Sequence, residues 1–168
     1  MLRARGFTLV EMLVVVVIVG VMAAAVGLVA SARDDHRAVR GEAERLAAVL
    51  QLLADEAVLD NREYGVRISR QAYEVRAYDN RKGRWHAQPG STRRHLPDNL
   101  HLQLILEGAP LALPASMDED SPPQIVLSSS AQGTPFSVRI ADISRHDVVY
   151  RIDGDGLAEP EVQQVSMP

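Results

Sequence analysis

A single carboxylate, Glu11, stands at the front of a long apolar run near the N-terminus. The residues from Met12 to Ala32 include no charged side chain, and as a helix they would span roughly 32 Å, about one bilayer core. A charge at the centre of such a helix costs about 2.5–3.5 kcal/mol on insertion scales, and less near an interface. An ionisable residue in this setting is therefore a candidate functional group, and pairing with a cation is the first chemistry that the sequence indicates.

Two ordinary interpretations of residues 1–32 fit only in part. A secretory signal peptide agrees with the basic residues Arg3 and Arg5, but the apolar run exceeds the roughly 7–15 residues of a signal-peptide core. A plain signal anchor would keep the basic end in the cytoplasm and export the rest of the chain. That anchor needs no glutamate, so neither interpretation explains Glu11.

The stretch "RGFTLVE", from Arg5 to Glu11, resembles the processing site of type IV prepilins and of the pseudopilins of type II secretion. The resemblance implies that a membrane prepilin peptidase cuts after Gly6 and then N-methylates Phe7. It further implies that Glu11 pairs with the N-terminal amine of a neighbouring subunit during assembly. Such pairing lowers the free-energy cost of a charge in lipid. One departure is Leu28, which stands where many pilins have a proline that kinks the helix.

No other motif predicts a catalytic or metal site. The segment Asp153–Gly156 looks like a fragment of a calcium loop but lacks the further ligands, and we interpret it as a hairpin turn. Ser128–Ser130 lacks the glycine frame of a nucleophile elbow. Trp85 fits a core residue, or a lid over a sheet, better than a surface anchor for a partner. The following histidines show no metal-ligand spacing: His36, His86, His95, His101 and His146.

Composition narrows the function further. The chain has 168 residues, no cysteine and a net charge of -4, so it can form neither a disulfide nor a thiolate metal site. An acidic chain does not favour nucleic-acid binding. We therefore expect no enzymatic activity, no cofactor, no metal and no small-molecule substrate.

The elements that carry these residues follow from hydrophobic periodicity. One helical stripe is formed by Val39, Ala43, Leu46, Leu50, Leu53 and Ala57. We expect this amphipathic helix to pack on a sheet of its own domain, with Gly41 as a weak point. Period-two alternation then predicts short strands with no helices between them, which indicates an α+β fold with two antiparallel sheets. The expected strands contain residues 64–68, 73–77, 85, 100–106, 125–127, 136–140 and 148–152.

Two segments are predicted as long loops, at 87–99 and 107–123, and the second carries an acidic group at Asp118–Asp120. The predicted organisation is a leader at 1–6, a transmembrane assembly helix at 7–32, an amphipathic helix at 33–61, a periplasmic β domain at 62–156 and a flexible tail at 157–168.

The layout after residue 61 resembles the H-type minor pseudopilins of type II secretion, which share a domain family with the minor pilin FimT. The carrying features are a Tyr-rich hairpin and Gly83-Arg84-Trp85. The resemblance implies a structural subunit of the periplasmic pseudopilus that exports folded proteins across the outer membrane. It implies a single-pass inner-membrane location, and as partners the prepilin peptidase and the other minor and major pseudopilins.

The alternative is a FimT-like minor pilin in DNA uptake. That class needs a basic face, often near the C-terminus, but residues 153–168 contain four acidic side chains and no Lys or Arg. A periplasmic enzyme on the same anchor would need a catalytic constellation, which the sequence lacks.

Overall fold

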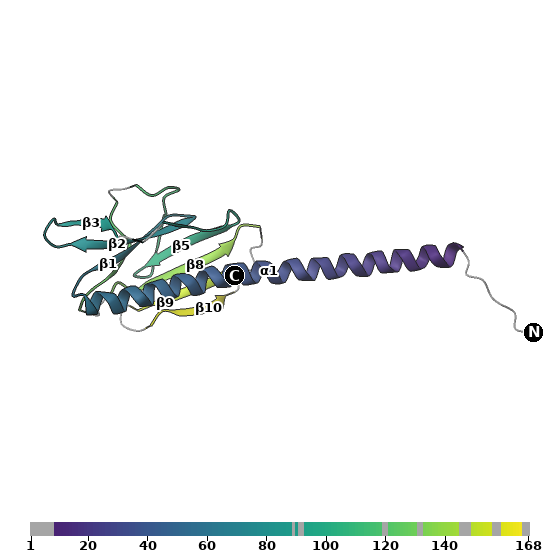
Figure 1. Ribbon diagram of the computed structural model, residues 1–168, viewed down its shortest axis with the longest axis horizontal. Coiled ribbons are helices and arrows are strands. Elements are labelled where there is room, and N and C mark those ends of the chain that lie inside the picture. Colours follow the sequence, from purple (N-terminus) through teal and green to yellow (C-terminus); the bar gives the residue numbers. More distant parts are fainter. Residues whose placement is uncertain are drawn as a thin grey trace, which may run out of the picture. The chain divides into compact units, whose positions relative to one another are not determined.

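The computed structural model describes residues 9–88, 90, 93–118, 121–130, 133–144, 149–155 and 159–165, without the side chains of 25–35. The chain divides into two compact units, Met1–Arg37 and Ala38–Pro168. Helix α1 (Leu9–Leu59) begins in the first unit and ends in the second (Figure 1). The predicted leader at 1–6 and Phe7 lie outside the described residues.

From Leu9 to Ala24, helix α1 carries large apolar side chains on every face, with Glu11 as the one charged residue in that range. Between Leu9 and Met22 these side chains are 46–83% exposed. The segment predicted to span a membrane, 7–32, is described only in part. Among the described residues, no helix is long and apolar enough to qualify as a membrane span.

In the second unit, the predicted helical stripe is confirmed as core. Its six residues are at most 3% exposed: Val39, Ala43, Leu46, Leu50, Leu53 and Ala57. The helix continues without interruption through Gly41. Asn61, with a positive φ of 48°, terminates it, and Arg62 N donates to the Ala57 carbonyl at 3.1 Å. This is a Schellman end, in which asparagine takes the left-handed position that glycine more often fills.

The first antiparallel sheet has the strand order β3-β2-β1-β7, with β4 paired to β2. Its strands are β1 (Tyr64–Ile68), β2 (Ala72–Asp79), β3 (Arg84–Ala87), β4 (Arg94–His95) and β7 (Ile125–Leu127). Val66 pairs with Val75 on β2 and with Ile125 on β7. Tyr64, Val66 and Ile68 alternate along β1 and are buried in the core.

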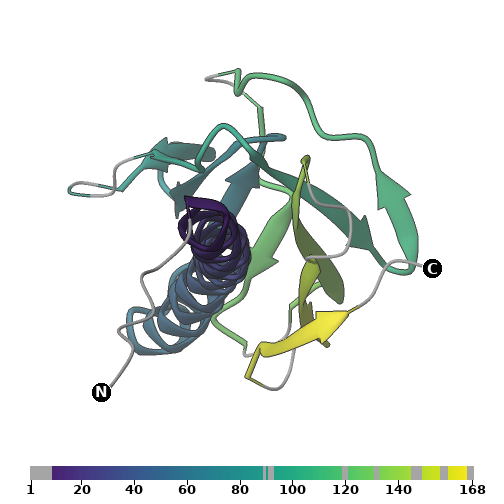
Figure 2. The same ribbon diagram turned by 90° about the vertical axis from the view of Figure 1, so that its right-hand side faces the viewer.

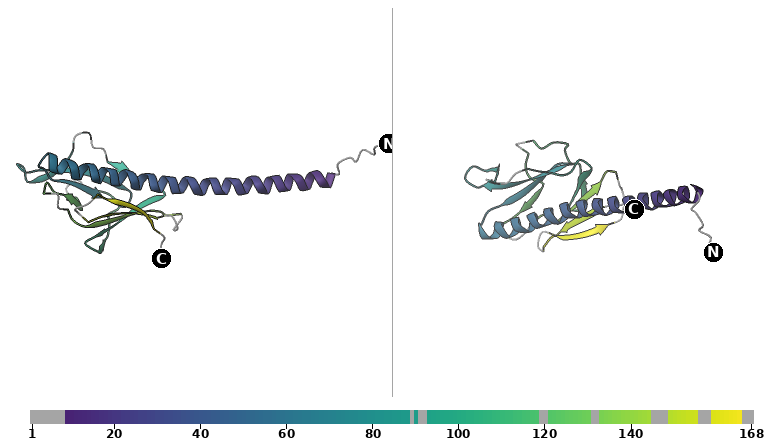
Figure 3. Two further views of the ribbon diagram at one scale, coloured as in Figure 1. Left: turned by 90° about the horizontal axis from the view of Figure 1, so that it is seen from below. Right: turned by 45° about the vertical axis from the view of Figure 1, so that its right-hand side comes forward.

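The second antiparallel sheet has the order β10-β9-β8-β5-β6. Its strands are β5 (Leu100–Leu106), β6 (Ala109–Leu111), β8 (Phe136–Asp142), β9 (Val149–Gly154) and β10 (Glu161–Val165). The strands of both sheets lie on one side of the C-terminal part of α1 (Figures 2 and 3). The predicted α+β class with two antiparallel sheets is confirmed.

Three strands lie where the sequence predicts none. β4 lies in the loop predicted at 87–99, and β6 lies in the loop predicted at 107–123. The prediction of a flexible tail at 157–168 is wrong for Glu161–Val165, which pairs with β9 through five residue pairs. Backbone hydrogen bonds to the open edge of β9 hold β10, and these bonds need little apolar sequence.

The prediction of a hairpin turn at Asp153–Gly156 is wrong for its first two residues. Asp153 and Gly154 end strand β9, and Gly154 pairs with Phe136. A Cβ on Gly154 would lie 2.5 Å from the Phe136 ring. The glycine therefore allows an aromatic ring to lie against the backbone, a packing role that the turn interpretation missed.

Candidate assembly site

Glu11 lies in the first turn of α1, and its exposed side chain is surrounded by exposed apolar residues such as Met12 and Val15. Gly6 and Phe7, the two residues of the predicted cleavage site, fall outside the described residues. The structure therefore places one of the three predicted site residues, on the helix that the sequence assigned to it.

A buried group of charges on the first sheet was not predicted. Arg67, 1% exposed, pairs with Glu74 in the register of β1 and β2, and its Nη2 donates to Glu74 Oε2 at 2.9 Å. The guanidinium groups of Arg76 and Arg93 lie 3.2 Å and 3.1 Å from the same carboxylate. One glutamate thus neutralises part of the charge of three arginines.

Glu74 remains ionised in this setting. Burial alone raises the pKa of the Glu74 carboxyl, but the hydrogen bonds from Arg67 and Arg93 and the charge of Arg76 outweigh burial. The net result is a pKa below the ordinary value for glutamate. The carboxylate therefore stays available as the common acceptor of the group.

Arg67 also binds the segment that the sequence predicts as a long loop at 107–123. Arg67 Nη1 donates to the carbonyls of Asp118 and Ser121. Gln124 bonds both backbone groups of Ile68, accepting from its N–H at 2.8 Å and donating to its carbonyl at 3.1 Å. The described part of this segment is thus attached to β1 through the Arg67 guanidinium.

Trp85 lies outside the main core, which was one of the two places, core or lid over a sheet, that the sequence favoured for it. Its half-buried ring packs against Tyr78 across β2 and β3, with centroids 5.1 Å apart and an interplanar angle of 59°. Three exposed cations, Arg81, Lys82 and Arg84, sit on the same hairpin. The aromatic pair therefore stabilises the β2–β3 hairpin by a cross-strand contact outside the main core.

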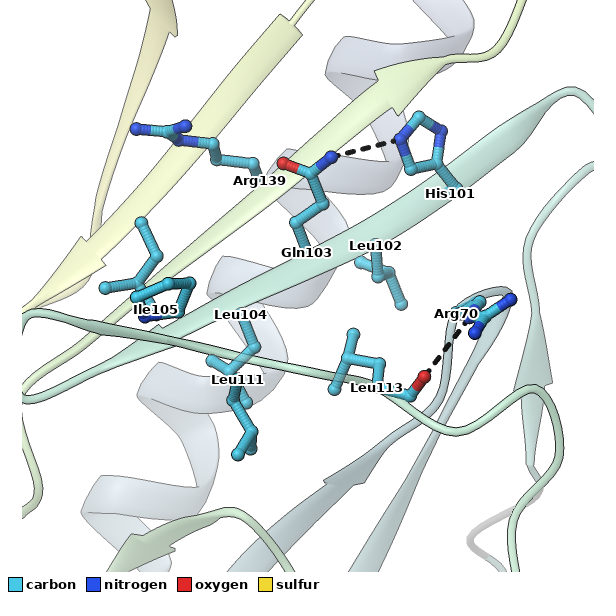
Figure 4. Close-up of a pocket in the computed structure, with 10 residues that line it drawn as sticks. Arg70, His101, Leu102, Gln103, Leu104, Ile105, Leu111, Leu113 and Arg139 are labelled. Atoms are coloured by element: carbon cyan, nitrogen blue, oxygen red, sulfur yellow. Dashed lines mark hydrogen bonds between the residues drawn. The ribbon is translucent and has the colours of Figure 1, made fainter.

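An open pocket of about 340 Å³ lies beside β5, where the chain leaves β6 (Figure 4). Arg70, His101, Gln103 and Arg139 supply its polar lining. Its apolar lining consists of Leu102, Leu104, Ile105, Pro110, Leu111 and Leu113. None of these ten residues is acidic, so the pocket is cationic on a chain whose net charge is -4.

Among the described residues, no group of three or more His, Cys, Asp or Glu is placed to hold a metal ion. Asp153 is instead an acceptor for Arg151, whose Nε lies 2.6 Å from Asp153 Oδ2. His101 contacts Gln103, and His146 lies outside the described residues.

Comparison with known proteins decides the family. A model of the prokaryotic N-terminal methylation motif matches residues 1–27, and a model of the type II transport protein GspH matches residues 42–157. The chain belongs to the GspH family. The first match covers the segment that contains Gly6, Phe7 and Glu11, and the second covers α1 from Glu42 and most of both sheets.

Relatives agree with this GspH assignment over almost the full chain. The type II secretion system protein H of Pseudomonas aeruginosa is 38% identical over 97% of this chain and 98% of the relative. The Escherichia coli protein of the same name is 28% identical over 83% of this chain and 82% of the relative. This GspH chain is therefore similar to those proteins over most of its length.

Solved structures share the GspH fold. The minor pseudopilin EpsH of the Vibrio cholerae type II secretion system superimposes with a TM-score of 0.58 at 21% identity, over 77% of this chain and 97% of that chain. The solution structure of Escherichia coli GspH gives a TM-score of 0.60 at 19% identity, over 77% and 90%. At such identities the likeness establishes the fold.

Proposed function

We propose that this chain is a minor pseudopilin, a structural subunit of the periplasmic pseudopilus of a type II secretion system. The observation that carries the proposal is the full-length similarity to type II secretion proteins H, which joins an N-terminal methylation motif to a GspH domain in one chain. The same similarity favours protein secretion over the DNA-uptake alternative. In this function the chain assembles with other pseudopilins and catalyses no reaction.

The anchor and its location follow from the uncharged apolar run between Met12 and Ala32. A helix that is apolar on every face needs lipid or other helices around it, because water solvates such a surface poorly. We assign residues 7–32 to the inner membrane as a single pass, with Arg3 and Arg5 on the cytoplasmic side. Residues 33–165 then lie in the periplasm, where a fold without cysteine depends on its packed core.

The processing site follows from the methylation motif. We assign cleavage to the bond between Gly6 and Phe7, followed by N-methylation of the Phe7 amine. Cleavage creates an ammonium group, and Glu11 lies within the first turn of α1. We assign the pairing of Glu11 to the Phe7 amine of a neighbouring subunit, which joins opposite charges within an apolar bundle.

Two measurements on protein extracted from membranes test this function: the intact mass of the chain and its co-purification with other pseudopilins. The expected species begins at methylated Phe7 and is recovered with other pseudopilins. A mature chain that begins at Met1, or near Ser31, would contradict the processing assignment. A correctly processed chain that never associates with a pseudopilin would contradict the structural role.

A further inference from the structure

Arg139 is placed where sheet pairing disfavours it. It lies on β8 directly opposite Arg151 of β9, and like charges in that relation destabilise a sheet. Arg151 is compensated by Asp153 at 2.6 Å. Arg139 makes none of the ion pairs found among the described residues, and its buried Nε has no hydrogen-bond partner there. Half-buried Arg139 thus carries a positive charge that no described residue of this chain compensates, which makes it a candidate binding residue.

A second polar side chain, Gln103, lies beside it on the neighbouring strand. Gln103 is opposite Arg139 in the register of β5 and β8, and Figure 4 shows it between Arg139 and His101. The Gln103 amide nitrogen lies 3.4 Å from Nε2 of the His101 ring, whose other nitrogen is Nδ1. That Nδ1 is also buried without a partner among the described residues. Because an arginine Nε–H can only donate, the ligand that Arg139 lacks is an acceptor.

Arg70 is held in place on the other side of the pocket. Its backbone N–H donates to the Pro114 carbonyl at 3.0 Å, and its carbonyl accepts from Leu102 at 2.7 Å. Its Nε donates to the Leu113 carbonyl at 3.2 Å. These bonds fix the exposed guanidinium before any ligand arrives, which reduces the entropy lost on binding.

The remaining wall is apolar and partly open to solvent. Leu111 is 41% exposed at the end of β6, an edge strand paired only to β5 among the described residues. Half-buried Ile105 and exposed Pro110 lie beside it. A ligand that fills this pocket must therefore bring an apolar side chain as well as an acceptor.

We propose that this pocket binds a segment of a different pseudopilin that presents one carboxylate next to an aliphatic side chain. This rests on the proposed function. The carboxylate pairs with Arg139, because a guanidinium and a carboxylate form strong charge-assisted hydrogen bonds. Arg70 adds positive charge on the other side of the pocket. The aliphatic side chain contacts Ile105 and Leu111. Nucleic acid fits less well, because the chain is acidic and most of the pocket lining is apolar.

In this proposal the pocket determines which pseudopilin binds next to this chain. The Glu11 pairing uses chemistry that the resemblance assigns to the whole family, so that pair holds subunits together without distinguishing them. Selection of one neighbour must then come from the domain surface, where charge complementarity sets partner and register. The pocket supplies a cationic and an apolar contact side by side, which few segments satisfy together.

Site-specific photocrosslinking of the full chain in its own cells tests the proposal. One photoreactive residue replaces exposed Gln103, and a second version of the chain carries it at Val14 in α1 as a probe of assembly itself. The expected Gln103 crosslink joins a different pseudopilin, through a peptide with Asp or Glu beside an aliphatic residue. Arg139→Gln should lower that crosslink roughly tenfold, the factor that corresponds to about 1.4 kcal/mol. Arg84→Gln, an exposed arginine on the other sheet, is the matched control and should leave it unchanged.

The outcomes separate the two proposals. A Gln103 crosslink to a second copy of this chain, to lipid, or to a peptide without a carboxylate overturns the pocket assignment. A crosslink that survives Arg139→Gln overturns it as well. If Val14 crosslinks to pseudopilins and Gln103 does not, only the pocket proposal fails, whereas the loss of both contradicts the structural role. The Arg139→Gln variant should have a melting temperature no lower than that of the wild type, because the substitution relieves repulsion by Arg151. If the variant nevertheless fails to fold, the identity of the peptide crosslinked at Gln103 in the chain that keeps Arg139 still decides the proposal.

Discussion

Arg67 and Glu74 form an ion pair that is buried on the outer side of the first sheet, with 2.9 Å between Nη2 and Oε2. The two residues are direct partners in the register of β1 and β2. Arg67 also reaches the carbonyls of Asp118 and Ser121, so the pair connects two neighbouring strands to the segment that crosses them. Removal of either charge should affect both the sheet and that segment.

Glu74→Gln should destabilise the domain by about 3–5 kcal/mol at pH 7, because it leaves Arg67 and Arg76 buried without their counter-charge. Urea denaturation measures this loss. Arg40→Gln is the control, since its pair with Glu44 is exposed and contributes little. A loss below about 1 kcal/mol would mean that the buried pair is replaceable by hydrogen bonds alone.

The same carboxylate should give the domain an acid-sensitive stability. The folded pKa of Glu74 lies below its ordinary value, so its contribution is complete above that value and is lost as pH falls towards the folded pKa. Wild-type stability should therefore fall more steeply below about pH 4.5 than that of Glu74→Gln. Denaturation series at several pH values measure the two slopes, and parallel slopes would contradict the assignment.

Gly65→Ala should destabilise the domain by about 1–3 kcal/mol, because the new methyl group would overlap Pro123. The added Cβ would lie 2.7 Å from Pro123 Cβ and 3.2 Å from the Ile125 carbonyl oxygen. Limited proteolysis should then cut the 107–123 segment faster. Gly41→Ala is the matched control, because no described residue has an atom within 4 Å of a Cβ added there, apart from its own helical surroundings. It should stabilise the helix by up to about 1 kcal/mol.

Truncation after Pro160 should lower the thermal midpoint and promote self-association. It removes β10, with five residue pairs to β9 and the contact of Val162 with the core. Each lost ladder hydrogen bond is worth about 0.5–1.5 kcal/mol, and the uncovered edge of β9 can pair with another chain. Truncation after Val165 is the control and should change neither the midpoint nor the sedimentation. An unchanged midpoint in the shorter chain would show that β10 is dispensable.

The fragment that begins at Arg33 should fold as a soluble monomer without metal. Its core combines the helical stripe of α1 with both sheets, and the described residues hold no cluster of metal-binding side chains. Thermal melts with and without a chelator should coincide. A midpoint lowered by more than about 4 °C, equivalent to roughly 1 kcal/mol or more, would reveal a bound ion.

Hydrophobic periodicity predicted the helix and the strands that bury one face in the core. Steps of three and four located the stripe from Val39 to Ala57, and alternation located β1, β5 and β8, because each of these elements has one face in the core. The short strands β4, β6 and β10 form because their backbones pair with the edge of another strand. Their own side chains carry no periodic pattern that predicts this pairing.

The candidate sites divide in the same way. Glu11 was visible because a charge within an apolar run is anomalous by itself. Arg67 and Arg139 were not, because each occupies an ordinary polar position in an alternating strand. The pairing of Arg67 with Glu74, and of Arg139 with Arg151, exists only after the strand registers are set. The alternation of Arg139 with Val138 and Ile140 does predict that its side chain lies on the outer face of the sheet. The sequence of one strand does not predict that Arg151 lies opposite it.

The Glu11 series tests the assembly mechanism. Glu11→Ala should leave cleavage after Gly6 intact but weaken or abolish incorporation into the pseudopilus, because the Phe7 amine of a neighbour loses its counter-charge. Glu11→Asp should be intermediate, since it keeps the charge but shortens the reach by one methylene. Glu11→Gln should lie closer to Ala, because an amide accepts a hydrogen bond but does not neutralise an ammonium.

Co-purification or crosslinking with other pseudopilins measures incorporation, and a secretion assay at native expression measures its consequence. Met12→Ala is the matched control, because it shortens an exposed apolar side chain at the next position without changing charge. Normal assembly and secretion by Glu11→Ala would mean that the pairing is dispensable in this chain. In that case the domain surface must hold the subunit, and Arg139→Gln should then reduce incorporation itself as well as the contact made at Gln103.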